Sequence, residues 1–185
     1  MIEDLLQDAN RRMDRSIEAV RNEFNTVRTG RASTALLDRI EIDYYGQRTP
    51  LKQLATINVP ESRLLTVQPF DPGSLRAIER AIQESDLGLT PSNDGKLIRL
   101  PIPALTEERR KELVKVIRHM AEEGRIAIRN VRRDVIHHLK ELANDGEVGG
   151  DEERRAEERV QKLTDEHTKT IDEVLKHKEA EILEV

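Results

Sequence analysis

The sequence predicts an α+β protein, in which an elongated three-helix bundle carries a small inserted domain of mixed strands and helix. Two observations carry this prediction. Apolar residues recur at spacings of three and four near both ends of the 185-residue chain, which is the period of amphipathic helices. Between these segments lies a block of short alternating stretches that contains all seven prolines, at positions between 50 and 103.

The first predicted helix covers residues 2–27, and Gly30 supplies a plausible stop. Its apolar positions form a single seam, which is suited to packing against other helices. The seam consists of Ile2, Leu6, Ala9, Met13, Ile17, Val20, Phe24 and Val27.

The middle block reads as a small mixed α/β domain. The stretch "RIEIDYYGQRTPL" alternates and turns at Gly46, which is typical of a β-hairpin. Short strands are predicted in "ATINV" and "RLLTVQPF", and another after the turn at Asp94-Gly95. One helix is predicted in "DPGSLRAIERAIQES", where Asp71 can cap and Pro72 fits the first turn.

Two further helices are predicted after the middle block. The first begins with Thr106 as N-cap and runs to about residue 143, and the second follows the loop "NDGEVGGDEE". Their seams are Val114, Ile117, Ala121, Ile128, Val131, Val135 and Leu142 in the first, and Ala156, Val160, Leu163, Ile171, Val174 and Ile182 in the second.

None of the three helices can bury its seam alone, so we expect one bundle formed by residues 1–30 and 105–185. Residues 31–104 are then an inserted domain, entered and left through two short connectors, 29–33 and 101–105. A double connection of this kind suits a hinge between rigid bodies. The expected hinge residues are Thr29, Gly30, Arg31, Pro101 and Pro103.

Composition excludes several classes of chemistry. The chain has no cysteine, which removes disulfides, thiol catalysis and cysteine-based metal sites. The N-terminus has no apolar stretch of the signal-peptide kind, and no run approaches the roughly 20 apolar residues of a membrane span. We therefore expect a cytoplasmic protein with no membrane partner.

The stretch "RIAIRNVRRD" concentrates four arginines at positions 125, 129, 132 and 133 of a chain whose net charge is −5. On a helix, Arg118, Arg125, Arg129 and Arg132 fall within an arc of roughly 60° beside the apolar seam. Pairs such as Arg125/Arg129 set like charges at i,i+4, which costs about 0.2–0.5 kcal/mol each. An external polyanion would explain a face that opposes its own helix.

The chain has only four aromatic residues, Phe24, Tyr44, Tyr45 and Phe70, which are too few for base stacking on single strands. Arginines without stacking partners indicate recognition of phosphates on a folded RNA. Arg28 and Arg31 could extend the same surface.

Other chemistry has little support in the sequence. Asp134 and His138 are spaced i,i+4 without an evident third ligand, and the remaining histidines are scattered. No catalytic triad order or nucleotide fingerprint occurs. We expect no enzyme, cofactor, metal or small-molecule substrate. The alternative from another class is a coiled-coil interaction module that oligomerises through its seams, with solvated arginines.

Five ordered stretches resemble the bacterial ribosome recycling factor family: "VRTGRAS", "IDYYGQRTPLKQLA", "SDLGL", "DGKLIRLPIPALTEERRKELVK" and "RNVRRD". The resemblance covers essentially the whole chain. It implies an L-shaped molecule, in which a three-helix bundle and a smaller β/α/β domain meet at a flexible hinge.

The resemblance also implies a function. The family binds the post-termination ribosome and, with elongation factor G and GTP, separates the subunits and releases messenger RNA and deacylated tRNA. Arg129, Arg132 and Arg133 match its contacts with large-subunit (23S) ribosomal RNA, and Arg28 and Arg31 match a second basic group beside the hinge. The implied partners are the large ribosomal subunit and elongation factor G, and we expect a monomer.

Overall fold

The structure is a computed structural model that describes residues 1–183, and the chain divides into two compact units. The first unit combines residues 1–28 with the segment that starts at 107, and the second covers residues 29–106. The α+β class predicted from the sequence is confirmed.

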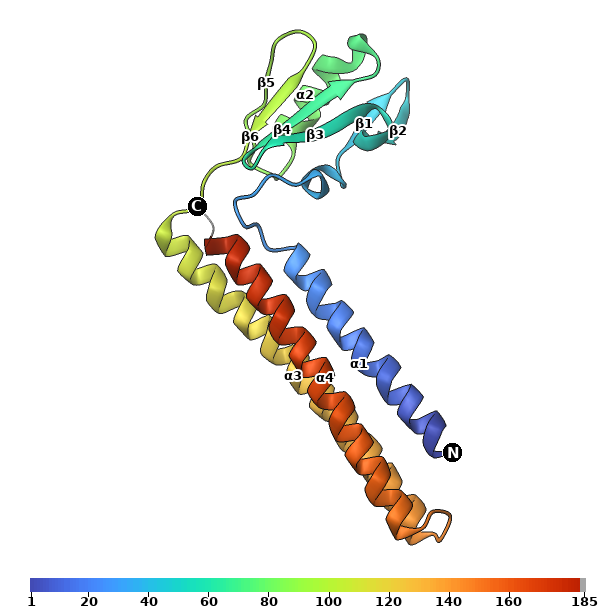
Figure 1. Cartoon of the computed structure of the whole chain (residues 1–185). Helices are drawn as coiled ribbons and strands as arrows, with labels where there is room; N and C mark the ends of the chain where they lie inside the picture. Colours follow the sequence, from blue (N-terminus) through green and yellow to red (C-terminus); the bar gives the residue numbers. More distant parts are fainter. Residues whose placement is uncertain (184–185) are drawn as a thin grey trace. The chain divides into compact units, whose positions relative to one another are not determined.

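Three long helices make up the first unit: α1 (Ile2–Asn25), α3 (Glu107–Asn144) and α4 (Gly150–Leu183). Each helix packs against the other two (Figure 1). Two contacts for each pair of helices fix the directions. Arg12 pairs with Asp134, and Val20 lies against Gly124, so α1 runs antiparallel to α3. Glu3 pairs with Arg159, and Asp14 with His167, so α1 runs parallel to α4.

The predicted seams form the core of this bundle. Six of the eight α1 seam residues and all seven α3 seam residues are buried, whereas Leu163 and Val174 of α4 are only partly so. Gly124 lets α1 and α3 approach closely, because a Cβ at this position would lie 2.4 Å from Val20 Cγ2. A side chain here would require the helices to move apart.

The second unit is built on antiparallel strands. β1 (Glu41–Tyr44) and β2 (Gln47–Pro50) form a hairpin, and a four-stranded sheet has the order β3-β4-β6-β5. The sheet strands are β3 (Ala55–Glu61), β4 (Leu64–Pro69), β5 (Ser92–Asn93) and β6 (Ile98–Pro101). Helix α2 (Leu75–Glu84) contacts β1 and β4 and buries Ile78 and Ile82 in the core of the unit.

Turn chemistry explains the local structure of this unit. Tyr45 and Gly46 both have positive φ, 51° and 83°, as a two-residue hairpin turn requires. Asp71 accepts a hydrogen bond from the Gly73 backbone at 3.0 Å and so starts the turn that leads into α2, as predicted.

The sequence prediction differs from the structure at one helix end and in several short elements. α1 ends at Asn25 rather than 27, because the backbone N–H groups of Thr26 and Val27 bond the carbonyls three residues back. A short 3₁₀ helix at Thr34–Leu37 and the two-residue strand β5 were not predicted. Elements this short carry too little periodicity to register in sequence.

Candidate nucleic-acid interface

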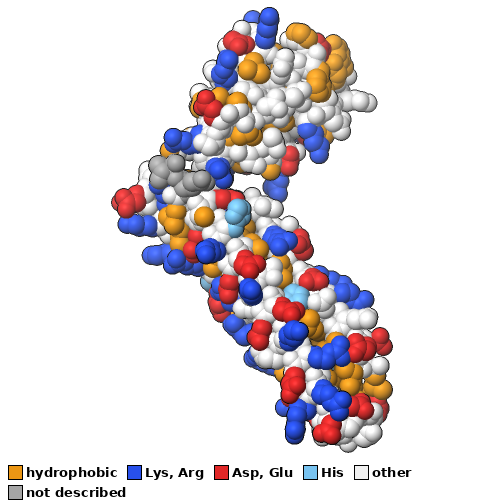
Figure 2. Space-filling model, viewed as in Figure 1, with side chains coloured by type: hydrophobic (Ala, Val, Ile, Leu, Met, Phe, Trp, Pro, Cys, Tyr) orange, Lys and Arg blue, Asp and Glu red, His pale blue; other side chains and the backbone are white. Residues whose placement is uncertain are grey.

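Three of the arginines singled out in the sequence, Arg118, Arg125 and Arg132, contact α4 from α3. Contacts pair residue 118 with 179, 125 with 172 and 132 with 161, which follows the antiparallel course of the two helices. Figure 2 views the molecule from the direction of Figure 1, and there basic and acidic side chains alternate over the bundle. The arginines must therefore be compared one by one.

Arg125 is the most enclosed of the set, with a side chain only 19% exposed. Its Nε and Nη2 donate to Asp172 Oδ1 at 2.9 and 2.6 Å, and its Nη1 donates to Glu122 Oε2 at 3.1 Å. Partial burial opposes its charge, but the two carboxylates more than offset this, so the pKa of Arg125 is raised. All three nitrogens are occupied, which makes Arg125 a cross-link between α3 and α4.

Arg129 is more open. Its Nη2 donates to Glu122 Oε1 at 2.7 Å, and its side chain is 40% exposed. Arg118 is bonded through Nε to Glu179 of α4 at 2.6 Å, and this hydrogen bond raises the pKa of Arg118. Both residues are charged and accessible, and each has one nitrogen engaged with a carboxylate.

Arg132 and Arg133 differ from the preceding arginines because neither has a carboxylate partner among residues 1–183. Arg132 is half-buried and donates through Nη1 to the amide oxygen of Gln161 at 3.3 Å. Arg133 is exposed and makes no hydrogen bond or ion pair within the described part of the chain. A phosphate could approach these two guanidinium groups without displacing a protein anion.

The expectation that the arginine face opposes its own helix is wrong for Arg125 and Arg129. Glu122 lies three residues before Arg125 and seven before Arg129, and it bonds both, so the like-charge pair is bridged by an acid on the same helix. Asp172 adds a second acid from α4. The interpretation that the whole arc faces solvent or a ligand is also wrong for Arg125.

Arg28 and Arg31 lie on either side of the boundary between the two units. Arg28 is the last residue of the first segment of the bundle and Arg31 belongs to the second unit; both side chains are exposed. Each makes a contact of its own within the protein.

The expected hinge residues fall in two chain segments that touch each other. Gly30 has φ +78°, and a Cβ there would lie 3.2 Å from Leu105 Cγ. Further along, the Ala32 backbone donates to Ser62 O at 2.7 Å and Ile102 donates to Arg63 O at 2.8 Å. Both segments are thus tied to the turn between β3 and β4, and Pro101 belongs to the sheet, where it pairs with Leu64.

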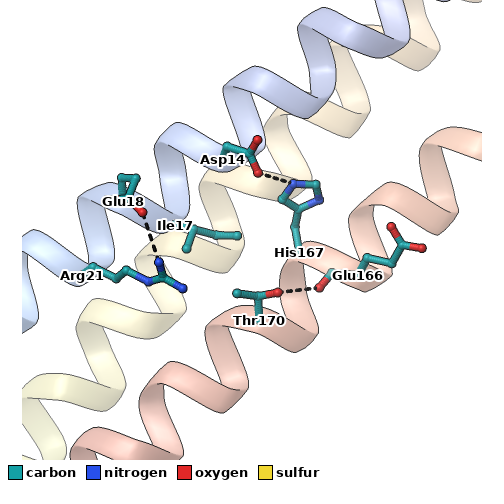
Figure 3. A pocket seen from close by; sticks show the side chains of 7 residues that line it. All are labelled: Asp14, Ile17, Glu18, Arg21, Glu166, His167 and Thr170. Atoms are coloured by element: carbon teal, nitrogen blue, oxygen red, sulfur yellow. Dashed lines mark hydrogen bonds and ion pairs between the residues drawn. The ribbon is translucent and has the colours of Figure 1, made fainter.

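A second polar site lies between α1 and α4, around His167 (Figure 3). The ring is buried; Nδ1 lies 2.7 Å from Leu163 O and Nε2 lies 2.8 Å from Asp14 Oδ1. Because a carbonyl can only accept, Nδ1 carries a proton. His167 is therefore a packing histidine joined to α1.

The described residues 1–183 contain no group of three or more His, Cys, Asp or Glu side chains arranged to hold a metal. Within the same range, no helix is long and apolar enough to cross a membrane.

Four residues that hold the arginines escaped sequence reasoning: Glu122 on α3, and Gln161, Asp172 and Glu179 on α4. Glu122 could have been found, since its i,i+3 spacing to Arg125 is visible in the sequence. The other three lie on another helix, and only the packing of α4 against α3 brings them to the arginines.

This architecture defines a two-unit α+β protein, in which a three-helix bundle with an arginine-bearing helix is interrupted by a small antiparallel sheet unit. The family model described as "Ribosome recycling factor" matches residues 20–183. The chain belongs to the ribosome recycling factor family, as its sequence motifs had suggested.

Curated relatives agree over nearly the whole chain. The ribosome-recycling factor of Rubrobacter xylanophilus is 61% identical over 180 residues, covering 97% of both chains. That of Carboxydothermus hydrogenoformans is 55% identical over 185 residues, covering all of both.

Solved structures agree as well. A solution structure of the ribosome recycling factor has a TM-score of 0.78 at 43% identity, covering 100% of this chain and 98% of the other. A second similar structure contains the T. thermophilus ribosome recycling factor and E. coli elongation factor G bound to the E. coli post-termination complex. It has a TM-score of 0.66 at 46% identity and covers 99% of both chains.

Proposed function

We propose that the bundle binds the large ribosomal subunit through phosphates of its 23S RNA, with Arg132 and Arg133 as the principal ligands and Arg129 beside them. One observation carries this proposal: Arg132 and Arg133 stand on α3 without a carboxylate partner among residues 1–183, while the three arginines between residues 118 and 129 are each paired with one. Guanidinium groups bind phosphates in a bidentate manner, so unpaired arginines on a rigid helix suit a folded RNA.

The second proposed partner is elongation factor G. Together with this factor and GTP, the protein would separate the ribosomal subunits and release messenger RNA and deacylated tRNA. Support comes from the similar structure in which a ribosome recycling factor and elongation factor G are bound to the post-termination complex. The bundle would hold the RNA, and the sheet unit would act as the lever. This role requires no catalytic residue, cofactor or membrane contact, and fits a cytoplasmic protein.

The lever needs a pivot, which we assign to residues 29–31 and 103–106. The hydrogen bonds of Ala32 and Ile102 to the β3–β4 turn support these limits, because residues beyond them are tied to the sheet. Thr29, Gly30, Arg31 and Pro103 remain in this proposal, while Pro101 moves with the sheet as part of β6. Arg28 and Arg31 would add a second basic contact beside the pivot.

The burial of the helix seams favours a monomer over an oligomerising module. The apolar seams of α1, α3 and α4 are largely buried against one another within a single chain. Of the large apolar side chains of α3, only Val116 and Ile126 are prominently exposed, at 43% and 45%. A coiled-coil module would need an unsatisfied seam for its partner.

Binding of purified large subunits tests the RNA contact. Arg132→Ala should lower the affinity by about tenfold, since a hydrogen bond to a charged group contributes about 1.5–3 kcal/mol. Arg21→Ala is the matched control, because it removes the same charge from an exposed position on α1. Equal affinities for the wild type and Arg132→Ala in low salt would contradict the proposed contact between Arg132 and the RNA.

The pivot is tested with an engineered disulfide between the two units. The chain has no natural cysteine, so the introduced pair is the only one, and the reduced protein is its own control. The oxidised form should bind ribosomes normally and fail to split them, with splitting restored by reductant. Undiminished splitting by the oxidised protein would refute the lever.

A further inference from the structure

Glu122 lies within the arginine-bearing part of α3 and contacts two of its members. Its Oε1 accepts a hydrogen bond from Arg129 Nη2 at 2.7 Å, and its Oε2 accepts one from Arg125 Nη1 at 3.1 Å. These bonds, with that of Arg129 the larger influence, hold the pKa of Glu122 below its ordinary value. One ionised carboxylate therefore fixes two guanidinium groups.

The next arginine is held from α4. Gln161 accepts from Arg132 Nη1 through its amide oxygen at 3.3 Å, and its Nε2 donates to Asp165 Oδ1 at 2.9 Å. Since a carboxylate can only accept, Asp165 fixes which end of the amide faces Arg132. Three successive arginines of the surface, at 125, 129 and 132, are thus each held by an acceptor.

Holding an arginine before it binds has two consequences. It removes part of the rotamer entropy that a free arginine loses on binding, which favours a ligand that matches the held position. It also sets a negative charge beside the guanidinium, which disfavours any polyanion that cannot avoid that charge. Of the three guanidinium nitrogens of Arg129, only Nη2 bonds another group among residues 1–183. Its Nε and Nη1 therefore remain available to a phosphate.

We propose that Glu122 is a positioning and specificity residue of the RNA-binding surface. It aims Arg129 at a phosphate of the folded RNA target and weakens the hold of this surface on polyanions of other shape. The inference rests on the proposed function and adds to it the residue that makes the arginine surface selective. Arg129 can bind a correctly spaced phosphate while it stays bonded to Glu122. A flexible strand cannot match the held position, so its affinity for this surface should increase most when the Glu122 carboxylate is removed.

The chain offers a close control in the adjacent residue. Glu123 has the same charge and lies on the same turn of α3, but it pairs with His119 Nε2 at 3.0 Å and contacts no arginine among residues 1–183. Glu123→Gln therefore makes the same change in net charge without touching the arginine surface. Glu122 and Glu123 are also similarly exposed, at 47% and 57%.

The experiment measures binding of the wild type, Glu122→Gln and Glu123→Gln to two probes, purified large ribosomal subunits and poly(U), over a range of salt. For Glu122→Gln, the ratio of subunit to poly(U) affinity should fall by about tenfold, as two charge-assisted bonds are weakened. Its poly(U) affinity should also depend more steeply on salt, with a slope larger by about 0.7 for each arginine released to the strand. Glu123→Gln should keep the wild-type ratio and slope.

A third readout reports positioning directly. The ¹⁵N relaxation of the Arg129 Nε–H group should show a restrained side chain in the wild type and in Glu123→Gln, and a mobile one in Glu122→Gln. Thermal unfolding confirms that all three proteins are folded. Because Glu122 is half exposed, neither substitution is expected to prevent folding.

An unchanged ratio for Glu122→Gln, or equal losses in both variants, would overturn the inference and leave the proposed function standing. A wild-type protein that binds large subunits no better than poly(U) would contradict the proposed function itself, and the inference with it. A selective wild type, a less selective Glu122→Gln and an unaffected Glu123→Gln would establish the role of Glu122.

Discussion

Two neighbouring stretches of α3 use the same residue type in different ways. Between residues 118 and 129, each arginine is bonded to a carboxylate, from Glu122 on α3 or from Asp172 and Glu179 on α4. One turn further on, Arg132 meets only a neutral amide and Arg133 meets no partner among residues 1–183. Charge alone therefore does not distinguish the two stretches; the presence or absence of a carboxylate partner does.

The comparison separates Arg118 and Arg125, which are bonded to α4, from Arg132 and Arg133, the proposed RNA ligands. Arg129 is bonded only to Glu122 within α3 and belongs beside the proposed ligands. Substitutions in the two stretches should then separate folding stability from ribosome affinity. The separation should be widest where both unpaired arginines are removed together, and narrowest where only the charge of one carboxylate changes.

Removing both unpaired arginines should have the largest effect. The double variant Arg132→Ala/Arg133→Ala should bind large subunits about 100-fold more weakly, a loss of about 2.7 kcal/mol from two charged contacts. Its free energy of unfolding should stay within about 0.5 kcal/mol of the wild type, because neither side chain is paired with a charge in the described structure. Subunit binding and urea unfolding measure the two quantities; a comparable loss in both would contradict the separation.

The scaffold beneath the arginines should be sensitive at Gly124. Gly124→Ala adds a Cβ that would lie 2.4 Å from Val20 Cγ2. Overpacking costs about 1–3 kcal/mol, and the better helix propensity of alanine regains about 1 kcal/mol, so the net loss of stability should be about 0–2 kcal/mol. Gly149→Ala, which meets nothing within 4 Å, is the control and should not destabilise. Equal unfolding midpoints for the two variants would mean that α1 and α3 are not closely packed here.

Arg125→Ala should show the opposite pattern to the double variant, with lower stability and nearly unchanged affinity for the large subunit. It removes a largely enclosed side chain that joins Asp172 to Glu122, so the free energy of unfolding should fall by about 1 kcal/mol, with solvent screening of the half-exposed acids limiting the loss. Large-subunit affinity should change by less than about threefold, since Arg125 offers no free nitrogen. A tenfold loss of affinity with unchanged stability would reassign Arg125 to binding.

The smallest effect concerns pH. The pKa of Glu122 is lowered in the folded protein, so its contribution to stability is present above its ordinary pKa and is lost as the pH falls through the lowered value. Thermal unfolding should therefore show the wild type slightly more stable than Glu122→Gln at pH 7, and the two proteins should converge once the pH falls below the lowered pKa of Glu122. A difference that persists at low pH would show that the carboxylate charge is not responsible.

Sequence reasoning predicted the fold class, because long helices with seams such as Val114–Leu142 and a hairpin at Tyr45-Gly46 are local patterns. Through the family motif, the sequence also predicts Arg129, Arg132 and Arg133 as RNA contacts, which stays a prediction. It could not predict that Asp172 and Glu179 neutralise Arg125 and Arg118, since these contacts depend on how α4 lies against α3. Nor could it predict the burial of His167 against Asp14, which also joins different helices.

The most direct test compares the salt dependence of large-subunit binding for the wild type, Arg125→Ala and Arg133→Ala. If Arg133 neutralises one phosphate, its loss should reduce the slope of log affinity against log salt by about 0.9. Arg125→Ala should keep the wild-type slope. Equal slopes for all three proteins, or a reduced slope for Arg125→Ala alone, would contradict the division between paired and unpaired arginines.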